Sequence, residues 1–218
     1  MFNGQAEQDR FVTSILKQKE NGFFLEIGSN HPININNSYL LETTYNWKGI
    51  MVEYDPAHLP GYKEHRPKSI HVIQDATTID YKALFQANNV PLNVDYLQID
   101  LEVDNGSTIQ TLEKLNNEVL DTHTFATVTF EHDIYRGDFF NTRLRSRQIF
   151  ADRGYMCVFM DIHNEELRYV YEDWYVHPSL VDMNYVNALM SKNAGFYEMS
   201  PITNHPSINW QKIDYRIG

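Results

Sequence analysis

Short apolar runs alternate with amphipathic segments along most of this chain. Strand-like runs, apolar and bounded by turn residues, occupy residues 23–27, 49–53, 69–74, 94–100, 125–131, 155–160 and 167–171. Segments with helical spacing occupy residues 37–44, 81–87, 108–117, 142–152 and 180–190, and another lies within residues 5–19. This alternation predicts an α/β fold with a mostly parallel sheet and helices on both faces.

The last two strand-like runs are joined without a helical segment. Residues 161–166 have the pattern of a hairpin loop, so we expect seven strands, with an antiparallel hairpin at one edge of the sheet. No repeat or flexible linker divides the chain. We therefore expect one domain: an N-terminal helix in residues 1–22, a Rossmann-like core in 23–175, and a C-terminal helix and tail in 176–218.

Apolar content, net charge and cysteine count limit the classes of protein to which this chain can belong. The 218 residues are 42% apolar, which suits a packed core, and carry a net charge of −11, which disfavours binding to a phosphate backbone. Cys157 is the single cysteine, so an intrachain disulfide is excluded and a reducing compartment is favoured. The sequence has neither a membrane-spanning apolar run nor a basic-then-apolar leader. We expect a cytoplasmic protein that has no nucleic-acid partner. We make no prediction of its oligomeric state.

Carboxylates occur at the ends of the first three strand-like runs, at Glu26, Glu53 and Asp75. In α/β nucleotide-binding folds, an acidic residue at the second of these ends commonly accepts hydrogen bonds from a ribose diol. A dinucleotide needs three glycines so that the backbone can approach its pyrophosphate, but here only Gly28 follows the first strand. S-adenosylmethionine has no pyrophosphate, and needs carboxylates for its ribose and amino group. The pattern therefore predicts this cofactor.

Five segments together resemble the FkbM-type methyltransferases. They are QAEQDRFV (5–12), FLEIGSN (24–30), NSYLLE (37–42), WKGIMVE (47–53) and DYLQIDLE (95–102). The resemblance extends to about Tyr155 and implies the Rossmann-like fold of class I methyltransferases, in which seven strands include an antiparallel pair. It also implies methylation of hydroxyl groups, very often on sugars of glycans or glycosides. Two positions depart from the family pattern: His31-Pro32 replaces an Asp-Gly pair, and Val103 replaces a glycine.

The resemblance and the strand ends together give the expected cofactor-binding residues. These are Gln8, Glu26, Gly28, Ser29, Asn30, Glu53, Asp75, Ala76 and Asp100.

Methyl transfer to an alcohol needs either a general base or a metal ion, because the hydroxyl pKa is far above 7. Asp100 and Glu102 lie two residues apart at the fourth strand end, and Glu131 and His132 end the fifth. We expect Asp100, Glu102 and His132 to be catalytic, with Glu102 or His132 as the base. A resemblance to metal-dependent sugar O-methyltransferases implies that Asp100, Glu131 and His132 could bind Mg²⁺ or Mn²⁺. A metal-free site remains the alternative.

The segment after the fifth strand mixes charged and aromatic residues. Tyr135, Arg136 and Asp138 are candidate contacts for a small-molecule or oligosaccharide acceptor. Two other functions stay open: an O-methyltransferase for a non-sugar hydroxyl, and a non-catalytic cofactor-binding domain of the same fold.

Overall fold

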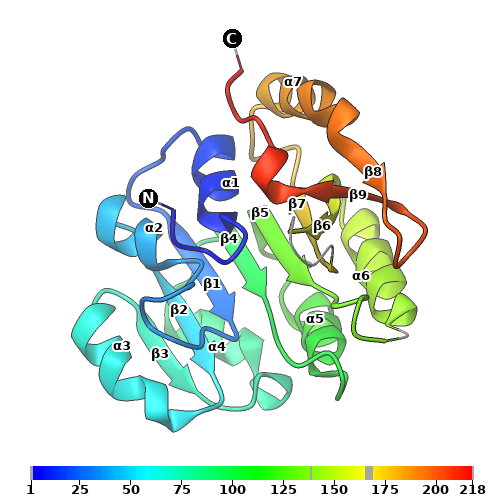
Figure 1. Cartoon of the computed structure of the whole chain (residues 1–218). Coiled ribbons are helices and arrows are strands. Elements are labelled where there is room, and N and C mark those ends of the chain that lie inside the picture. Colours follow the sequence, from blue (N-terminus) through cyan, green and yellow to red (C-terminus); the bar gives the residue numbers. More distant parts are fainter. Residues whose placement is uncertain (1, 138, 165–168, 218) are drawn as a thin grey trace.

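A mixed β-sheet forms the centre of the molecule (Figure 1). The computed structural model describes residues 2–137, 139–164 and 169–217. Within these residues, nine strands form one sheet in the order β3-β2-β1-β4-β5-β7-β6-β9-β8. The strands are β1 (Phe23–Ile27), β2 (Lys48–Glu53), β3 (Ile70–Ile73), β4 (Asn93–Ile99), β5 (Thr124–Glu131), β6 (Met156–His163), β7 (Val170–Val176), β8 (Tyr197–Met199) and β9 (Pro206–Asn209).

Strands β1 to β5 are parallel to one another. β1 lies between β2 and β4, while β3 extends the sheet beyond β2, and β5 beyond β4. Every residue of β1 is buried, because parallel neighbours flank it and helices cover both faces of the sheet. The carboxyl ends of these strands therefore meet at one edge of the sheet, which is where ligands bind in open α/β folds.

Helices cover the sheet on both sides, as the sequence predicted (Figure 1). The α-helices are α1 (Gln8–Ile15), α2 (Tyr39–Thr44), α3 (Leu59–His65), α4 (Tyr81–Ala87), α5 (Ser107–Glu118), α6 (Phe140–Asp152) and α7 (Met183–Asn193). Short 3₁₀ helices are η1 (Pro56–His58), η2 (Ala76–Thr78), η3 (Ala194–Phe196) and η4 (Trp210–Lys212). One apolar cluster joins α4, α5 and α6 to the sheet, and a second joins α1, α2, α3 and α7.

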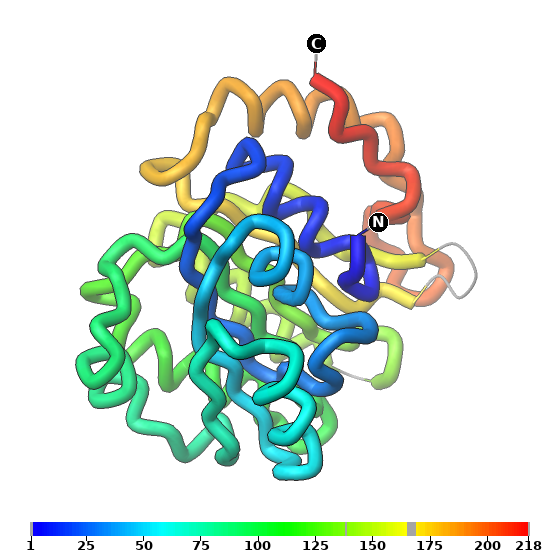
Figure 2. The backbone as a smooth tube through the Cα atoms, turned by 90° about the vertical axis from the view of Figure 1, so that its left-hand side faces the viewer, coloured from blue at the N-terminus to red at the C-terminus, as the bar shows by residue number. Residues whose placement is uncertain are grey.

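The C-terminal segment returns to the N-terminal helix. The guanidinium of Arg10 on α1 lies 4.8 Å from the centroid of the Tyr215 ring, and the red C-terminal segment passes beside the blue N-terminal segment in the second view (Figure 2). The last part of the chain also adds β8 and β9 to the sheet. It is therefore more than the helix and tail that the sequence predicted.

The expected antiparallel pair is confirmed in β6 and β7, but it does not lie at the edge of the sheet, and the sheet has nine strands in the described residues rather than seven. β7 runs antiparallel to both β5 and β6 and lies between them, and the sheet continues beyond β6 through β9 and β8. The expected loop at 161–166 begins too early, because Asp161–His163 belong to β6; residues 165–168 lie outside the described part. Acidic Glu172 and Asp173 interrupt the apolar pattern of β7, yet both are buried with hydrogen-bonding partners.

Candidate active site

The chain turns sharply at the end of β1. Gly28 has a φ of +84°, and the amide groups of Gly28 and Ser29 both donate to the Val52 carbonyl, at 2.9 and 3.1 Å. A Cβ at Gly28 would lie 1.7 Å from the Asp100 carbonyl oxygen. Only glycine allows the first loop to pass this close to the end of β4.

A cleft with two lobes opens at this edge of the sheet. The first lobe has a volume of about 570 Å³, and the second of about 460 Å³. Glu53, Leu101 and Glu102 line both, so the lobes adjoin. The first is also lined by Val52, Tyr54, Gln74, Asp75, Ala76, Thr77, Asn105, Ser107 and Gln110. The second is also lined by Gln5, Glu26, Gly28, Ser29, Asn30, Ile35, Asn36, Asn37, Asp100, Glu131, Asp133, Tyr135 and Arg136.

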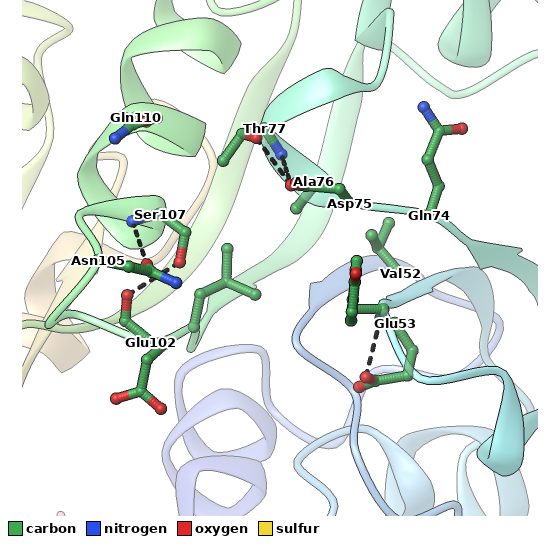
Figure 3. A pocket seen from close by; sticks show the side chains of 12 residues that line it. Val52, Glu53, Gln74, Asp75, Ala76, Thr77, Glu102, Asn105, Ser107 and Gln110 are labelled. Atoms are coloured by element: carbon green, nitrogen blue, oxygen red, sulfur yellow. Dashed lines mark hydrogen bonds between the residues drawn. The ribbon is translucent and has the colours of Figure 1, made fainter.

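Two carboxylates at strand ends mark the first lobe. Figure 3 shows Glu53 and Asp75 on one side of it and Glu102 on the other. Glu53 accepts a hydrogen bond from the Asn30 amide at 2.7 Å through Oε2, and its Oε1 accepts from two backbone amides of its own loop. Asp75 Oδ1 accepts from the amide and hydroxyl of Thr77, at 2.9 and 2.7 Å. Both side chains are thereby oriented without a ligand, and Glu53 Oε2 keeps acceptor capacity.

Carboxyl groups crowd the second lobe. Burial raises the pKa of Glu26, Asp100, Glu131 and Asp133. Asp100 and Glu131 share a hydrogen bond, and the negative charge of Asp100 raises the pKa of Glu131 further. Two like charges this close disfavour ionisation of both groups, and the pKa of Glu131 is raised further than that of Asp100, so Glu131 holds a shared proton more strongly. The pair is a carboxyl–carboxylate dyad facing the lobe.

Arg136 spans the loops after β4 and β5. It donates to Glu102 at 2.7 Å, to Asp104 at 3.0 Å and to Asp133 at 3.1 Å. The expected base Glu102 is therefore ion-paired at the junction of the two lobes. Tyr135 also lines the second lobe, and its ring stacks on Tyr169 with centroids 4.3 Å apart.

His132 does not join Asp100 and Glu131. Successive side chains of a strand point to opposite faces, so Glu131 faces the second lobe whereas His132 faces the other side of the sheet, where it is fully buried. The predicted roles of His132 as base and metal ligand are therefore incompatible with this arrangement.

His132 instead faces two buried aspartates. Its Nε2 lies 3.6 Å from oxygens of Asp161 and Asp173, and these three are the one set in the described chain whose potential ligand atoms all lie within 4.8 Å of one another. Arg143 already binds both oxygens of Asp161, at 2.9 and 3.0 Å, and Arg147 binds both of Asp173, at 2.7 and 2.8 Å. Two guanidinium charges balance the carboxylates, so this cluster is an ion-pair network rather than a metal centre.

Apart from Gln8, the expected cofactor residues all line the cleft. Gln8 is buried behind it: its Nε2 donates to Glu172 at 3.0 Å and its Oε1 accepts from the Ala6 amide at 2.8 Å. Gln5 lines the second lobe instead. The predicted acceptor contacts Tyr135 and Arg136 line it too, whereas Asp138 lies outside the described residues.

Sequence reasoning missed Asn36 and Asp133 in the second lobe. The spacing of Asp133 from Glu131, two residues, could have identified it, since the same spacing links Asp100 with Glu102. Asn36 carries no such signal, because it lies in an irregular polar loop.

The buried carboxyl of Glu172, behind the second lobe, gives a pH-dependent prediction. Burial raises its pKa from 4.5 to about 8, so the folded protein keeps a proton that the unfolded chain releases above about pH 4.5. The contribution of Glu172 to stability is complete below that pH and is lost as pH rises through 8. In Glu172→Gln, the amide oxygen can still accept from Gln8 and Trp174. We expect the stability of this variant relative to wild type to rise by up to about 1.4 kcal/mol per pH unit in this window.

Urea unfolding of both proteins across the pH series measures this difference. Exposed Glu20→Gln is the control and should show a constant difference. A pH-independent difference for Glu172→Gln would mean that Glu172 is ionised in the folded protein.

Comparisons with known proteins agree on the fold. No protein-family model matches the sequence, and no curated protein matches it with significance. Among solved structures, a candidate rRNA methylase from Clostridium thermocellum is 11% identical with a TM-score of 0.53, covering 81% of this chain and 98% of that chain. A candidate methyltransferase from Streptococcus mutans, in complex with SAH, is 9% identical with a TM-score of 0.50, covering 81% and 99%. The METTL16 methyltransferase domain is 10% identical with a TM-score of 0.51, covering 78% and 65%.

These likenesses do not single out the FkbM family within the class. None of the described helices is long and apolar enough to cross a membrane. The chain has the Rossmann-like α/β fold of S-adenosylmethionine-dependent methyltransferases, extended by two strands.

Proposed function

We propose that this protein is an S-adenosylmethionine-dependent O-methyltransferase of the FkbM type that acts on a sugar hydroxyl of a glycan or glycoside. The observation that carries the proposal is the two-lobed cleft at the carboxyl edge of the parallel strands, with Glu53 at the junction of its lobes. A ribose bound at Glu53 would place an adenine in the first lobe, near Asp75 and Ala76, and an amino-acid chain in the second. There Glu26 and Asp100 would meet the ammonium group and the positive sulfonium end.

The charge of the second lobe supports a neutral acceptor. Six carboxyl-bearing residues line this lobe, whereas Arg136 is the one basic residue among the described residues that line either lobe. Arg136 is itself bound to three carboxylates. A phosphate group would find no free cation here and would be repelled. Sugar hydroxyls can donate hydrogen bonds to these carboxylates, and half-buried Tyr135 with exposed Tyr169 stacked on it offers a flat surface for a sugar ring.

This charge distribution disfavours RNA, although one structural neighbour is named as a candidate rRNA methylase. The net charge of −11 acts in the same direction.

In the proposed reaction, the acceptor oxygen attacks the sulfonium methyl group in line with the breaking carbon–sulfur bond. The oxygen–methyl bond forms, the thioether leaves with the electron pair of the broken bond, and the hydroxyl proton passes to a carboxylate of the enzyme. The ionised member of the Asp100–Glu131 pair is suited to accept it, because a raised pKa brings a carboxylate closer to the basicity that the transfer needs. Most of the rate acceleration would come from holding the acceptor oxygen and the methyl group close together and correctly oriented.

The three-residue metal site expected from the sequence is not assembled, because His132 faces Asp161 and Asp173 instead. Asp100, Glu131 and Asp133 line one lobe, but no set of three ligand atoms from them lies within 4.8 Å in the described structure. The proposed proton transfer therefore uses carboxylates alone.

Isothermal titration of S-adenosylhomocysteine into the full chain, with and without Mg²⁺ or Mn²⁺, tests the cofactor site. We expect a dissociation constant in the micromolar range that neither metal changes. An affinity that depends on the metal would restore the metal-assisted mechanism, and no binding under any condition would overturn the proposed function.

A transfer assay with methyl-labelled S-adenosylmethionine tests the acceptor. We expect label to enter neutral oligosaccharides but not the same sugars carrying a phosphate, and not RNA. Label in RNA, or a preference for the phosphorylated sugar, would contradict the assignment of a neutral acceptor.

A further inference from the structure

Arg66 is a fully buried cation directly behind the second lobe. It follows the last residue of α3, and its guanidinium donates to Asn36 Oδ1 at 2.7 Å, Ser38 Oγ at 2.6 Å and Glu42 Oε2 at 3.0 Å. All three acceptors belong to the segment between β1 and the end of α2. A buried charge is tolerated only when it is paired and hydrogen-bonded, so the fold depends on Arg66 keeping this segment against α3.

The bond from Arg66 determines which way the Asn36 amide points. An arginine can only donate, so the side-chain oxygen of Asn36 must face it. The Nδ2 group of Asn36 then faces the cleft, where it donates to Glu26 Oε2 at 3.1 Å and to the Ser29 carbonyl at 2.9 Å. A flipped amide would place an oxygen against both acceptors.

Glu26 receives a second donor from the same segment. The Ser38 amide donates to Glu26 Oε1 at 3.0 Å, while the Ser38 hydroxyl accepts from Arg66. Each Glu26 oxygen therefore has one donor fixed by the segment that Arg66 holds. Burial raises the pKa of Glu26, and the charge of Arg66 and these hydrogen bonds oppose that rise.

We propose that Arg66 is a positioning residue of the cofactor site, which acts through Asn36 and Ser38 to present an ionised Glu26 to the ammonium group of the bound amino-acid chain. This inference rests on the proposed function and deepens it. Arg66 does not line the cleft itself. Its role is to orient the loop amides that set the position and charge of Glu26.

The variant Asn36→Asp tests whether Arg66 positions Glu26 through Asn36. It keeps an oxygen for Arg66, and the new charge pairs with that guanidinium, but an oxygen replaces the donor that faces Glu26. The probes are S-adenosylhomocysteine, which carries the amino-acid chain, and 5′-methylthioadenosine, which lacks it. We expect at least about a tenfold loss of S-adenosylhomocysteine affinity and less than about a twofold change for methylthioadenosine.

Two further variants test the same inference: one is a control, and the other changes Arg66 itself. Ser69→Ala removes a hydrogen bond to Glu42 on the far side of Arg66, and it should leave both affinities unchanged although it also weakens the network. Arg66→Lys keeps the charge but loses the planar fork that reaches three acceptors, so we expect it to show the same selective loss. Urea unfolding of each variant shows whether it remains folded under the conditions of the titration.

The outcomes separate this inference from the proposed function. Equal losses of both ligands in Asn36→Asp, or unchanged binding of S-adenosylhomocysteine, would overturn the positioning role of Arg66. Failure of the wild-type protein to bind either ligand would instead overturn the cofactor assignment on which the inference rests.

Discussion

Replacing Gly28 by alanine is expected to destabilise the protein by at least about 3 kcal/mol and to abolish cofactor binding. The added Cβ would lie 1.7 Å from the Asp100 carbonyl oxygen and 2.8 Å from its carbonyl carbon. Both contacts are to backbone, so no side-chain rotation can relieve them. The φ of +84° adds strain of its own, because an L-residue with a Cβ rarely adopts it. Relief requires β1 and the end of β4 to separate, which opens the floor of the cleft.

Urea unfolding measures the loss of stability, and titration of S-adenosylhomocysteine measures binding. Gly195→Ala is the matched control, because no atom lies within 4 Å of a Cβ at that position; its effect should stay within about 1 kcal/mol. A Gly28→Ala protein with wild-type stability and affinity would show that the first loop lies farther from β4 than described.

Removing the carboxylate of Glu53 is expected to have the largest effect on binding alone. Glu53 lines both lobes, so a ligand that spans them must pass it. A charge-assisted hydrogen bond from a ribose hydroxyl to Oε2 of Glu53, worth about 1.5–3 kcal/mol, predicts a loss of about tenfold to a hundredfold in S-adenosylhomocysteine affinity for Glu53→Ala. Methylthioadenosine should lose affinity equally, since it carries the same ribose. This equal loss contrasts with the selective loss expected for Asn36→Asp.

The variant Glu53→Gln distinguishes the effect of the Glu53 charge on binding from the effect of its hydrogen bonds to the loop. Glu53 also accepts from the amides of Asn30, Tyr54 and Asp55, and a glutamine can replace only part of this. Glu64→Ala removes the same charge from an exposed site on α3 and should not alter binding. Wild-type affinity in both Glu53 variants would place the ribose elsewhere and refute the proposed arrangement of the two lobes.

Local patterns were sufficient to predict the first half of the fold. β1, β2, β4 and β5 are short, mostly apolar runs bounded by turn residues, because most of their residues are buried. Their ends meet at one edge whatever the details of packing, so Glu26, Glu53 and Asp100 could be brought together by spacing alone. β7 was harder to delimit, because its acidic residues look like loop residues until their partners on α1 and α6 are known.

The sequence pattern also could not predict in which direction side chains point beyond the end of a strand. The amides of His132 and Asp133 both donate to the Tyr171 carbonyl, at 2.6 and 3.0 Å, and Asp133 has a φ of +47°. This turn leaves Asp133 in the second lobe with Glu131 and directs His132 away from it. Adjacent residues in the sequence thereby enter two separate networks.

Three features of this protein could be predicted from the amino-acid sequence: the alternation of strands and helices, the single glycine at the first turn, and the carboxylates at successive strand ends. These are local properties, since they depend on burial along one strand and on backbone freedom at one residue. The roles of Arg66, Gln8 and His132 could be assigned only from the folded structure, because each depends on a partner distant in sequence. Buried polar groups need such partners, and no spacing rule within a segment can name them.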